Sequence, residues 1–439
     1  MKFRLLIAIF FINTSVGAQM QFNSLQELLN YADANAIAIQ AATMSEKVAL
    51  AGKKETTADL LPTVNASLGY NDNITLQPTL VPAQMFDPEA PEGTFEEFTF
   101  GTKYNYSRSV QAQWDVLNFQ KIFAVQTANI EIEKSKLNTE VNKFNVYNSL
   151  ASTYYSILLT EASIRIYEEN LRVSTSIYEL AKGKYQDGII SEAEVNQAAI
   201  KKLQNQRNLN LVKSNLDQFY LQLQSQLNTR KEIRVSDSLD KFRMGDAVFS
   251  NAHPEVLLQE LEVKKSQSIL KQKKALRYPS LSLVYQNNKN WATNDFMDFS
   301  GANELPQQLF GVQVSMSGLL SRSTKQKIKQ SEWELGIQQM QLANTLLVKQ
   351  KEDELLQLQL KQAADQLAEN EEILSLQEQN DVHAENRYEN GIIGLDERLN
   401  KYDDLLAAQN NYLESLASLT IAQYKTYIRQ INFETSSNK

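Results

Sequence analysis

The side chains that could carry out chemistry are few and scattered in this chain. Its 439 residues include two histidines, His253 and His383, and no cysteine. Thiol nucleophiles, disulfides and cysteine-ligated metals are therefore excluded, and no glycine-rich phosphate loop or paired carboxylate motif accompanies either imidazole. His383 is expected to be a surface or packing residue on a helix flank. The sequence predicts a protein that is not an enzyme and that binds no cofactor and no metal.

Recognition by exposed groups is indicated instead by an octapeptide that occurs twice. KYQDGIIS runs from Lys184 to Ser191, and RYENGIIG runs from Arg387 to Gly394. Gly188 and Gly391 can take the left-handed conformation that ends a helix, so each octapeptide predicts a tip where an outgoing helix reverses. These tips cover residues 185–191 and 388–394.

The residues after the two glycines define a candidate docking surface. We expect the turns to expose two isoleucine pairs, Ile189 with Ile190 and Ile392 with Ile393. Ser191 is expected to cap the first returning helix, and Asp396 the second. The simpler alternative is that both motifs are ordinary helix C-caps.

Long segments without helix breakers lead to both tips. Neither glycine nor proline occurs from Phe119 to Lys182, and Gly336 is the only one from Leu320 to Tyr388. Helices of this length must pack side by side as coiled coils. After the second tip, residues that step alternately by four and three predict a heptad seam: Leu395, Leu399, Tyr402, Leu406, Gln409, Leu413 and Leu416.

Alternating apolar and polar residues precede each long helix and predict strands at about 62–76, 100–117, 279–287 and 309–318. The apolar side of the first strand carries Val64 and Leu68, and in the second strand only Arg108 interrupts it. The polar side is small and uncharged, as in a barrel wall that lines water. The alternative is an antiparallel sheet with one solvated face in a soluble protein.

Four strands cannot close a barrel, and open sheet edges are not tolerated in the bilayer core. Other copies must therefore complete the sheet. Eight strands leave an interior filled by side chains, whereas twelve leave more room, so a conduit favours a trimer. The segments 77–99 and 287–309 are expected to be long outer loops.

The amino terminus and the net charge indicate where the protein is located and which partners it can have. Residues 1–18 have the basic start, apolar run and small residues of a cleavable secretory signal. A formal net charge of -8 argues against a nucleic-acid partner. The sequence thus predicts an exported protein.

The whole mature chain resembles the TolC family of outer-membrane channel proteins. The resemblance is carried by ADLLPTVNASLGY, ALRYPSLSLVY, WDVLNF, SGLLSR, the opening of the second copy at His253 and the paired tips. It implies two tandem repeats, residues 19–228 and 251–439, joined by a segment, 229–250, in an equatorial belt. Each repeat would contribute a transmembrane β-hairpin and long coiled-coil helices.

The resemblance also implies an assembly and a location. Three copies would form a twelve-stranded barrel in the outer membrane of a Gram-negative bacterium, in contact with lipid, and a helical barrel across the periplasm. The tips would dock onto a periplasmic adaptor driven by an inner-membrane transporter of the RND or ABC class. The expected function is a passive conduit for efflux or type I secretion that opens at its helical tips.

Residues of the family's gate can be carried over one by one. A tyrosine that ties neighbouring coils closed corresponds to Tyr388, with Tyr185 its counterpart in the first tip. Its arginine partner corresponds to Ile393, a departure from the family. Two acids that narrow the pore correspond to Glu397 and Asn400, so Asp396 or Asp403 would have to supply a second charge. The alternative for each acid is a solvated helix face.

Two other functions compete with a tip-docking channel. A structural coiled-coil envelope protein, either a spacer or an adhesin stalk, would share the helices but conduct nothing. A self-contained porin is opposed by the long tip-bearing helices. The exported substrate, whether drug, metal or protein, is not indicated by the sequence.

Overall fold

A computed structural model describes residues 20–239, 249, 252–316, 318 and 320–431 of the chain. The predicted signal peptide and residues 240–248 and 250 of the expected linker lie outside these ranges. The chain divides into two compact units. The helical unit comprises Met1–Glu46, Ser135–Gln259 and Leu342–Lys439, and the sheet unit comprises Lys47–Lys134 and Glu260–Gln341.

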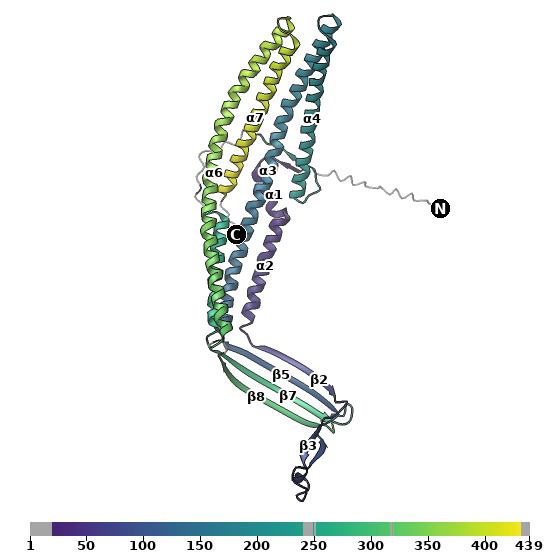
Figure 1. Ribbon diagram of the computed structural model, residues 1–439, viewed down its shortest axis with the longest axis vertical. Coiled ribbons are helices and arrows are strands. Elements are labelled where there is room, and N and C mark those ends of the chain that lie inside the picture. Colours follow the sequence, from purple (N-terminus) through teal and green to yellow (C-terminus); the bar gives the residue numbers. More distant parts are fainter. Residues whose placement is uncertain (1–19, 240–248, 250–251, 317, 319, 432–439) are drawn as a thin grey trace, which may run out of the picture. The chain divides into compact units, whose positions relative to one another are not determined.

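The sheet unit contains a four-stranded antiparallel sheet in the order β2-β5-β7-β8 (Figure 1). Its strands are β2 (Thr63–Asp72), β5 (Tyr104–Leu117), β7 (Ser280–Thr293) and β8 (Asn303–Ser315). Each strand overlaps one of the four predicted segments, but β2 ends before the predicted residue 76 and β5 begins after the predicted residue 100. Within the described chain, β2 and β8 have no strand on their outer edges.

The register places the predicted apolar positions on one face of this sheet. Val64 lies opposite Ala112, Ala112 opposite Tyr285, and Tyr285 opposite Phe310. Since directly opposed residues share a face, these side chains form one row across all four strands. The row on one side repeats the pattern with Trp114, Leu283 and Val312, whereas the row on the other side combines Ala66 and Val110 with Asn287 and Gln308. This face is therefore apolar over part of the strands, and the opposite face is predominantly polar.

The strands of the second hairpin are longer than the alternation predicted. β7 continues to Thr293 and β8 begins at Asn303, so the expected loop 287–309 shortens to residues 294–302. The apolar pattern ends earlier because Asn287 and Lys289 are polar, but backbone pairing continues. A bond from Trp291 Nε1 to Glu304 Oε1 (3.1 Å) supports the extension.

The first predicted outer loop also contains structure. β3 (Pro78–Pro82) and β4 (Phe95–Thr99) form a two-stranded hairpin, with a short 3-10 helix, η1 (Ala83–Met85), after β3. This hairpin projects from the end of the sheet (Figure 1). Pro78 and Pro82 stand at the two ends of β3, where a missing amide hydrogen is tolerated.

Seven helices are described: α1 (Leu25–Asn35), α2 (Ile37–Ala58), α3 (Phe119–Gln186), α4 (Glu192–Gln226), α5 (Pro254–Ala275), α6 (Arg322–Glu389) and α7 (Leu395–Gln430). The two long ones, α3 and α6, contain 68 residues each. Asn118 Oδ1 accepts the Lys121 amide at the start of α3, and Ser321 Oγ accepts that of Thr324 near the start of α6. None of the described helices combines the length and hydropathy needed to cross a bilayer.

The core of the helical unit gathers distant parts of the chain. β1 (Met20–Phe22) pairs in parallel with β6 (Ile233–Val235), and α1, α3, α4 and α7 pack around them. Leu28, Leu150, Leu223 and Ile428 are fully or almost fully buried there. The described part of the expected linker therefore packs into the core of this unit.

His253 lies directly before α5 and contacts its first turn. Its Nδ1 accepts the Glu255 amide at 3.2 Å, and its ring lies 5.1 Å from that of Phe144. Burial lowers the pKa of His253, and Lys349 and Arg429 lower it further while Glu255 and Asp353 oppose them. The imidazole therefore has a structural role as a neutral ring.

We expect this histidine to make stability depend on pH. The unfolded state binds a proton near pH 6.5, whereas the folded state resists it, so stability is lost as pH falls below about 6.5. His253→Asn keeps an acceptor for the Glu255 amide but cannot titrate. Between pH 7.5 and 5.5 the melting temperature should fall further for the wild type than for this variant. An equal decrease in melting temperature for the wild type and the variant would contradict the assignment of this pH dependence to His253.

Candidate functional site

The two tips have the same backbone geometry. At the first, the amide of Ile189 donates to the Lys184 carbonyl at 2.8 Å, and Gly188 has a φ of 73°. At the second, the amide of Ile392 donates to the Arg387 carbonyl at 2.8 Å, and Gly391 has a φ of 72°. Left-handed glycines thus end both α3 and α6, as predicted. Both turns lie at the same end of the helical unit (Figure 1).

The returning helices are capped differently. Ser191 Oγ accepts the Glu194 amide at 3.4 Å, and Glu194 Oε2 accepts the Ser191 amide at 2.7 Å, which completes a capping box. The predicted cap at Ser191 is confirmed. α7 begins after Gly394 without a side-chain cap, so the predicted cap by Asp396 is wrong.

The isoleucine pairs are split between the surface and the interior. Ile189 is 67% exposed and Ile392 65% exposed. Ile190 is half-buried, and Ile393 is only 7% exposed in a cluster with Tyr388 and other apolar residues. The expectation that both pairs would be exposed is therefore wrong for Ile393. Successive residues after the turn point to opposite sides, so one isoleucine per tip returns to the hairpin interior.

The two tip tyrosines also differ in their surroundings. Tyr185 is 44% exposed, whereas Tyr388 is 2% exposed and its hydroxyl has no hydrogen-bond partner in the described chain. Burial raises the pKa of Tyr388, so the hydroxyl stays protonated. Lys184 reaches across from the first tip: its Nζ donates to the Tyr388 carbonyl at 2.5 Å and lies 3.8 Å from the ring centroid. This lysine joins the two tips.

The candidate pore residues lie on the exposed face of α7. Asp396, Glu397 and Asn400 are all exposed. Glu397 Oε1 lies 3.6 Å from Arg387 Nη1, and both side chains are about half exposed. Such a surface pair contributes little to stability, so Glu397 remains available to an ion.

A buried ion pair that the sequence analysis missed lies between α6 and α7. Arg398 is 1% exposed and contacts Asp381 through both carboxylate oxygens, at 2.5 and 3.2 Å. The predicted heptad seam had assigned Leu399 to the interface. The local sequence carried no signal for this pair, because the partner of Arg398 on α7 lies on another helix, α6.

A second buried network joins the two hairpins. The Tyr402 hydroxyl donates to the Asn170 carbonyl at 2.7 Å and accepts from Asn205 Nδ2 at 2.9 Å. Burial raises the pKa of Tyr402, which keeps this hydroxyl a donor. Lys201 on α4 also pairs with Asp403 on α7. The hairpin α3–α4 is therefore fixed to the hairpin α6–α7 by polar contacts as well as by apolar packing.

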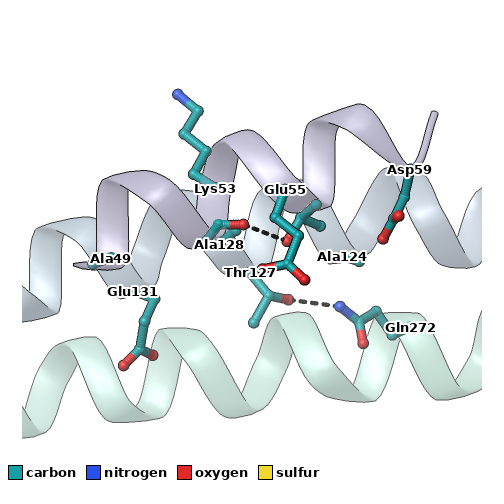
Figure 2. Close-up of a pocket in the computed structure, with 11 residues that line it drawn as sticks. Ala49, Lys53, Glu55, Asp59, Ala124, Thr127, Ala128, Glu131 and Gln272 are labelled. Atoms are coloured by element: carbon teal, nitrogen blue, oxygen red, sulfur yellow. Dashed lines mark hydrogen bonds between the residues drawn. The ribbon is translucent and has the colours of Figure 1, made fainter. Parts of the chain in front are cut away.

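A groove of about 440 Å³ lies between α2, α3 and α5 in the sheet unit (Figure 2). Gln272 donates to Thr127 Oγ1 at 3.0 Å across its floor, and small residues such as Ala124 and Ala128 line one wall. Glu131 is held in ion pairs with Lys134 and Lys265. We see no nucleophile or convergent acid–base pair here, and no group of metal-ligating residues occurs in the described ranges.

Comparison with known proteins gives the same architecture. Residues 28–229 match the family model of outer membrane efflux proteins. No curated protein matches the chain. Several solved structures match it. Their sequence identities are low, so this likeness establishes the fold alone.

Three of these structures illustrate the likeness. The channel CusC matches 92% of this chain and 91% of its own at 15% identity, with a TM-score of 0.73. VceC of Vibrio cholerae matches 93% and 96% at 14% identity (TM-score 0.71). The open state of MtrE of Neisseria gonorrhoeae matches 92% and 88% at 13% identity (TM-score 0.70).

Proposed function

We propose that the chain, of which residues 28–229 match the family model of outer membrane efflux proteins, works as a passive trimeric conduit in the outer membrane. In this proposal the sheet crosses the outer membrane, and the helices extend into the periplasm. The tips dock onto a periplasmic adaptor that is coupled to an inner-membrane transporter of the RND or ABC class. Drug efflux, metal export and type I secretion all fit this arrangement.

The observation that carries the proposal is a sheet with one apolar face and two unpaired edges. β2 and β8 present their outer backbone groups to no other strand of the described chain. Unpaired groups in the bilayer core cost several kcal/mol each, so the edges must pair with other copies. Three copies supply twelve strands, enough for a water-filled interior.

The helices next to these edges support the same closure. α2 leads into β2, and β8 is followed by α6, so pairing β8 of one copy with β2 of the next brings α6 beside α2. α6 exposes Trp333, Ile337 and Met340 along one stripe, at 64%, 46% and 66%. α2 exposes Met44 and Val48, at 59% and 71%. Contact between these stripes in a trimer would bury apolar surface that is otherwise left in water.

Native mass measurement of the detergent-solubilised protein tests the proposal. We expect a trimer, because the strands of each copy need those of two others to close. A monomer that retains full β-strand content would contradict it.

The facing of the strands predicts contrasting effects for two neighbouring substitutions in β8. Val314 lies opposite Leu281 on the apolar face, and Gln313 lies opposite Ser282 on the polar face. Val314→Asp puts a carboxylate against lipid, at a cost of up to several kcal/mol, while Gln313→Asp puts it in water. The yield of membrane-inserted trimer should fall sharply for the first variant only. Equal yields would show that the faces are assigned wrongly.

Glu397 is proposed as the main selectivity residue of the pore. Three symmetry-related carboxylates at a constriction would attract cations, and the weak pairing with Arg387 would not neutralise them. Glu397→Gln should lower cation selectivity, measured as the reversal potential in a salt gradient. Asp217→Asn, a matched change at an exposed acid of α4, should leave it unchanged. Unaltered selectivity in the Glu397 variant would place the filter elsewhere, at Asp396 or Asp403.

A further inference from the structure

One row of the apolar face of the sheet carries two cations. Arg108 on β5 lies directly opposite Leu68 on β2 and opposite Lys289 on β7. Opposed side chains on neighbouring strands have Cβ atoms roughly 5 Å apart, and like charges at this spacing destabilise the sheet. The row therefore needs a counter-charge.

The described chain supplies that counter-charge to only one of the two cations. Lys289 Nζ lies 2.8 Å from Glu304 Oε2 on β8. Arg108 is exposed, and no carboxylate of the described residues lies within ion-pair distance of it. The positive charge of Arg108 thus remains without a partner on this face of the sheet.

Aromatic side chains mark the depth of this row in the proposed barrel. The next row towards the outer loops contains Tyr70, Tyr106 and Trp291, together with Glu304 on β8, and lies two residues or about 7 Å along the strands. Tyrosine and tryptophan gather where lipid tails meet headgroups. Lys289 Nζ lies 5.1 Å from the centroid of the Trp291 ring. Long cationic side chains just inside such a belt extend towards the headgroups.

We propose that Arg108 and Lys289 bind the phosphate of an anionic lipid in the outer leaflet. The site rests on the proposed barrel, because only there does this face meet lipid. The phosphate oxygens would accept charge-assisted hydrogen bonds from the Arg108 guanidinium and share the Lys289 ammonium with Glu304. The apolar row of Ala112, Tyr285 and Phe310, which lies two rows below, would contact the acyl chains.

Lipid titration of the purified trimer, followed by native mass spectrometry, tests this site. Phosphatidylglycerol and the zwitterionic phosphatidylcholine serve as probes. Arg108→Gln should weaken binding of the anionic lipid about tenfold, and Arg108→Lys should weaken it less. Arg207→Gln, the same charge change at an exposed arginine of α4, should leave binding as in the wild type. Phosphatidylcholine should bind all variants equally.

The possible outcomes distinguish a failure of the lipid site from a failure of the proposed barrel. Equal binding of phosphatidylglycerol by the Arg108→Gln and Arg207→Gln variants would overturn the lipid site while the trimer stands. If inorganic phosphate at the same concentration displaced the bound lipid, the ligand of this site would be a free phosphate and not a lipid. A monomer in the same spectra would overturn the barrel and the lipid site together.

Discussion

Replacing Gly188 and Gly391 together with valine is expected to abolish export that depends on this channel. Both glycines have a positive φ, of 73° and 72°, which a β-branched residue adopts only with strain. No atom lies near enough to either glycine to clash with an added Cβ. The damage should therefore come from the turn and stay at the tips, where docking onto the adaptor is proposed. The variant should still yield a membrane-inserted trimer.

A third glycine in the second tip provides the matched control. Gly394 also has open space around an added Cβ, but its φ is -78°, which valine accepts. Gly394→Val should retain most export, measured as survival or secretion in cells that depend on the channel. Normal export by a surface-expressed Gly188→Val/Gly391→Val channel would refute docking at the tips.

Replacing Asp381 with leucine is expected to destabilise the second hairpin by about 3–5 kcal/mol. The substitution leaves the Arg398 guanidinium, which is 1% exposed, as an uncompensated buried charge. Hydrogen exchange of the α6 and α7 amides in the intact trimer measures the effect near the tip. Faster exchange should appear in these segments, and the sheet of the other unit should be unaffected.

Two further variants show whether the charge itself is responsible. Adding Arg398→Met to Asp381→Leu removes both charges, and exchange should return close to that of the wild type. Glu397→Gln breaks the half-exposed pair with Arg387 and should cost no more than about 1 kcal/mol. A double variant as unstable as Asp381→Leu alone would show that packing, and not charge, holds the hairpin.

The long helices and the faces of the strands could be predicted because both depend on local rules. α3 runs unbroken from Phe119 to Gln186 because neither glycine nor proline occurs before Gly183, and Gly183 itself stays helical, so the helix ends only at Gly188. The strands keep a period of two, so a list of alternate residues already gave the apolar face that the register confirms. The left-handed tips follow from two glycines in matching octapeptides.

The contacts between helices could not be predicted in the same way. A heptad pattern assigned Leu399 and Leu406 to the seam of α7, but both are half-buried, while Arg398 and Leu405 lie inside. α7 packs against more than one helix, which rotates the buried face, and an arginine can be buried only because Asp381 meets it. Such a partner lies on another helix and leaves no mark on the local pattern.

Current measurement in planar lipid bilayers tests the conduit most directly. The purified trimer is expected to insert and conduct in discrete steps, with preference for cations over anions. Its conductance should rise when the tips are loosened by Asp381→Leu. A trimer that inserts into the bilayer and carries no current, in the wild type and in this variant alike, would contradict the channel and favour a structural envelope protein.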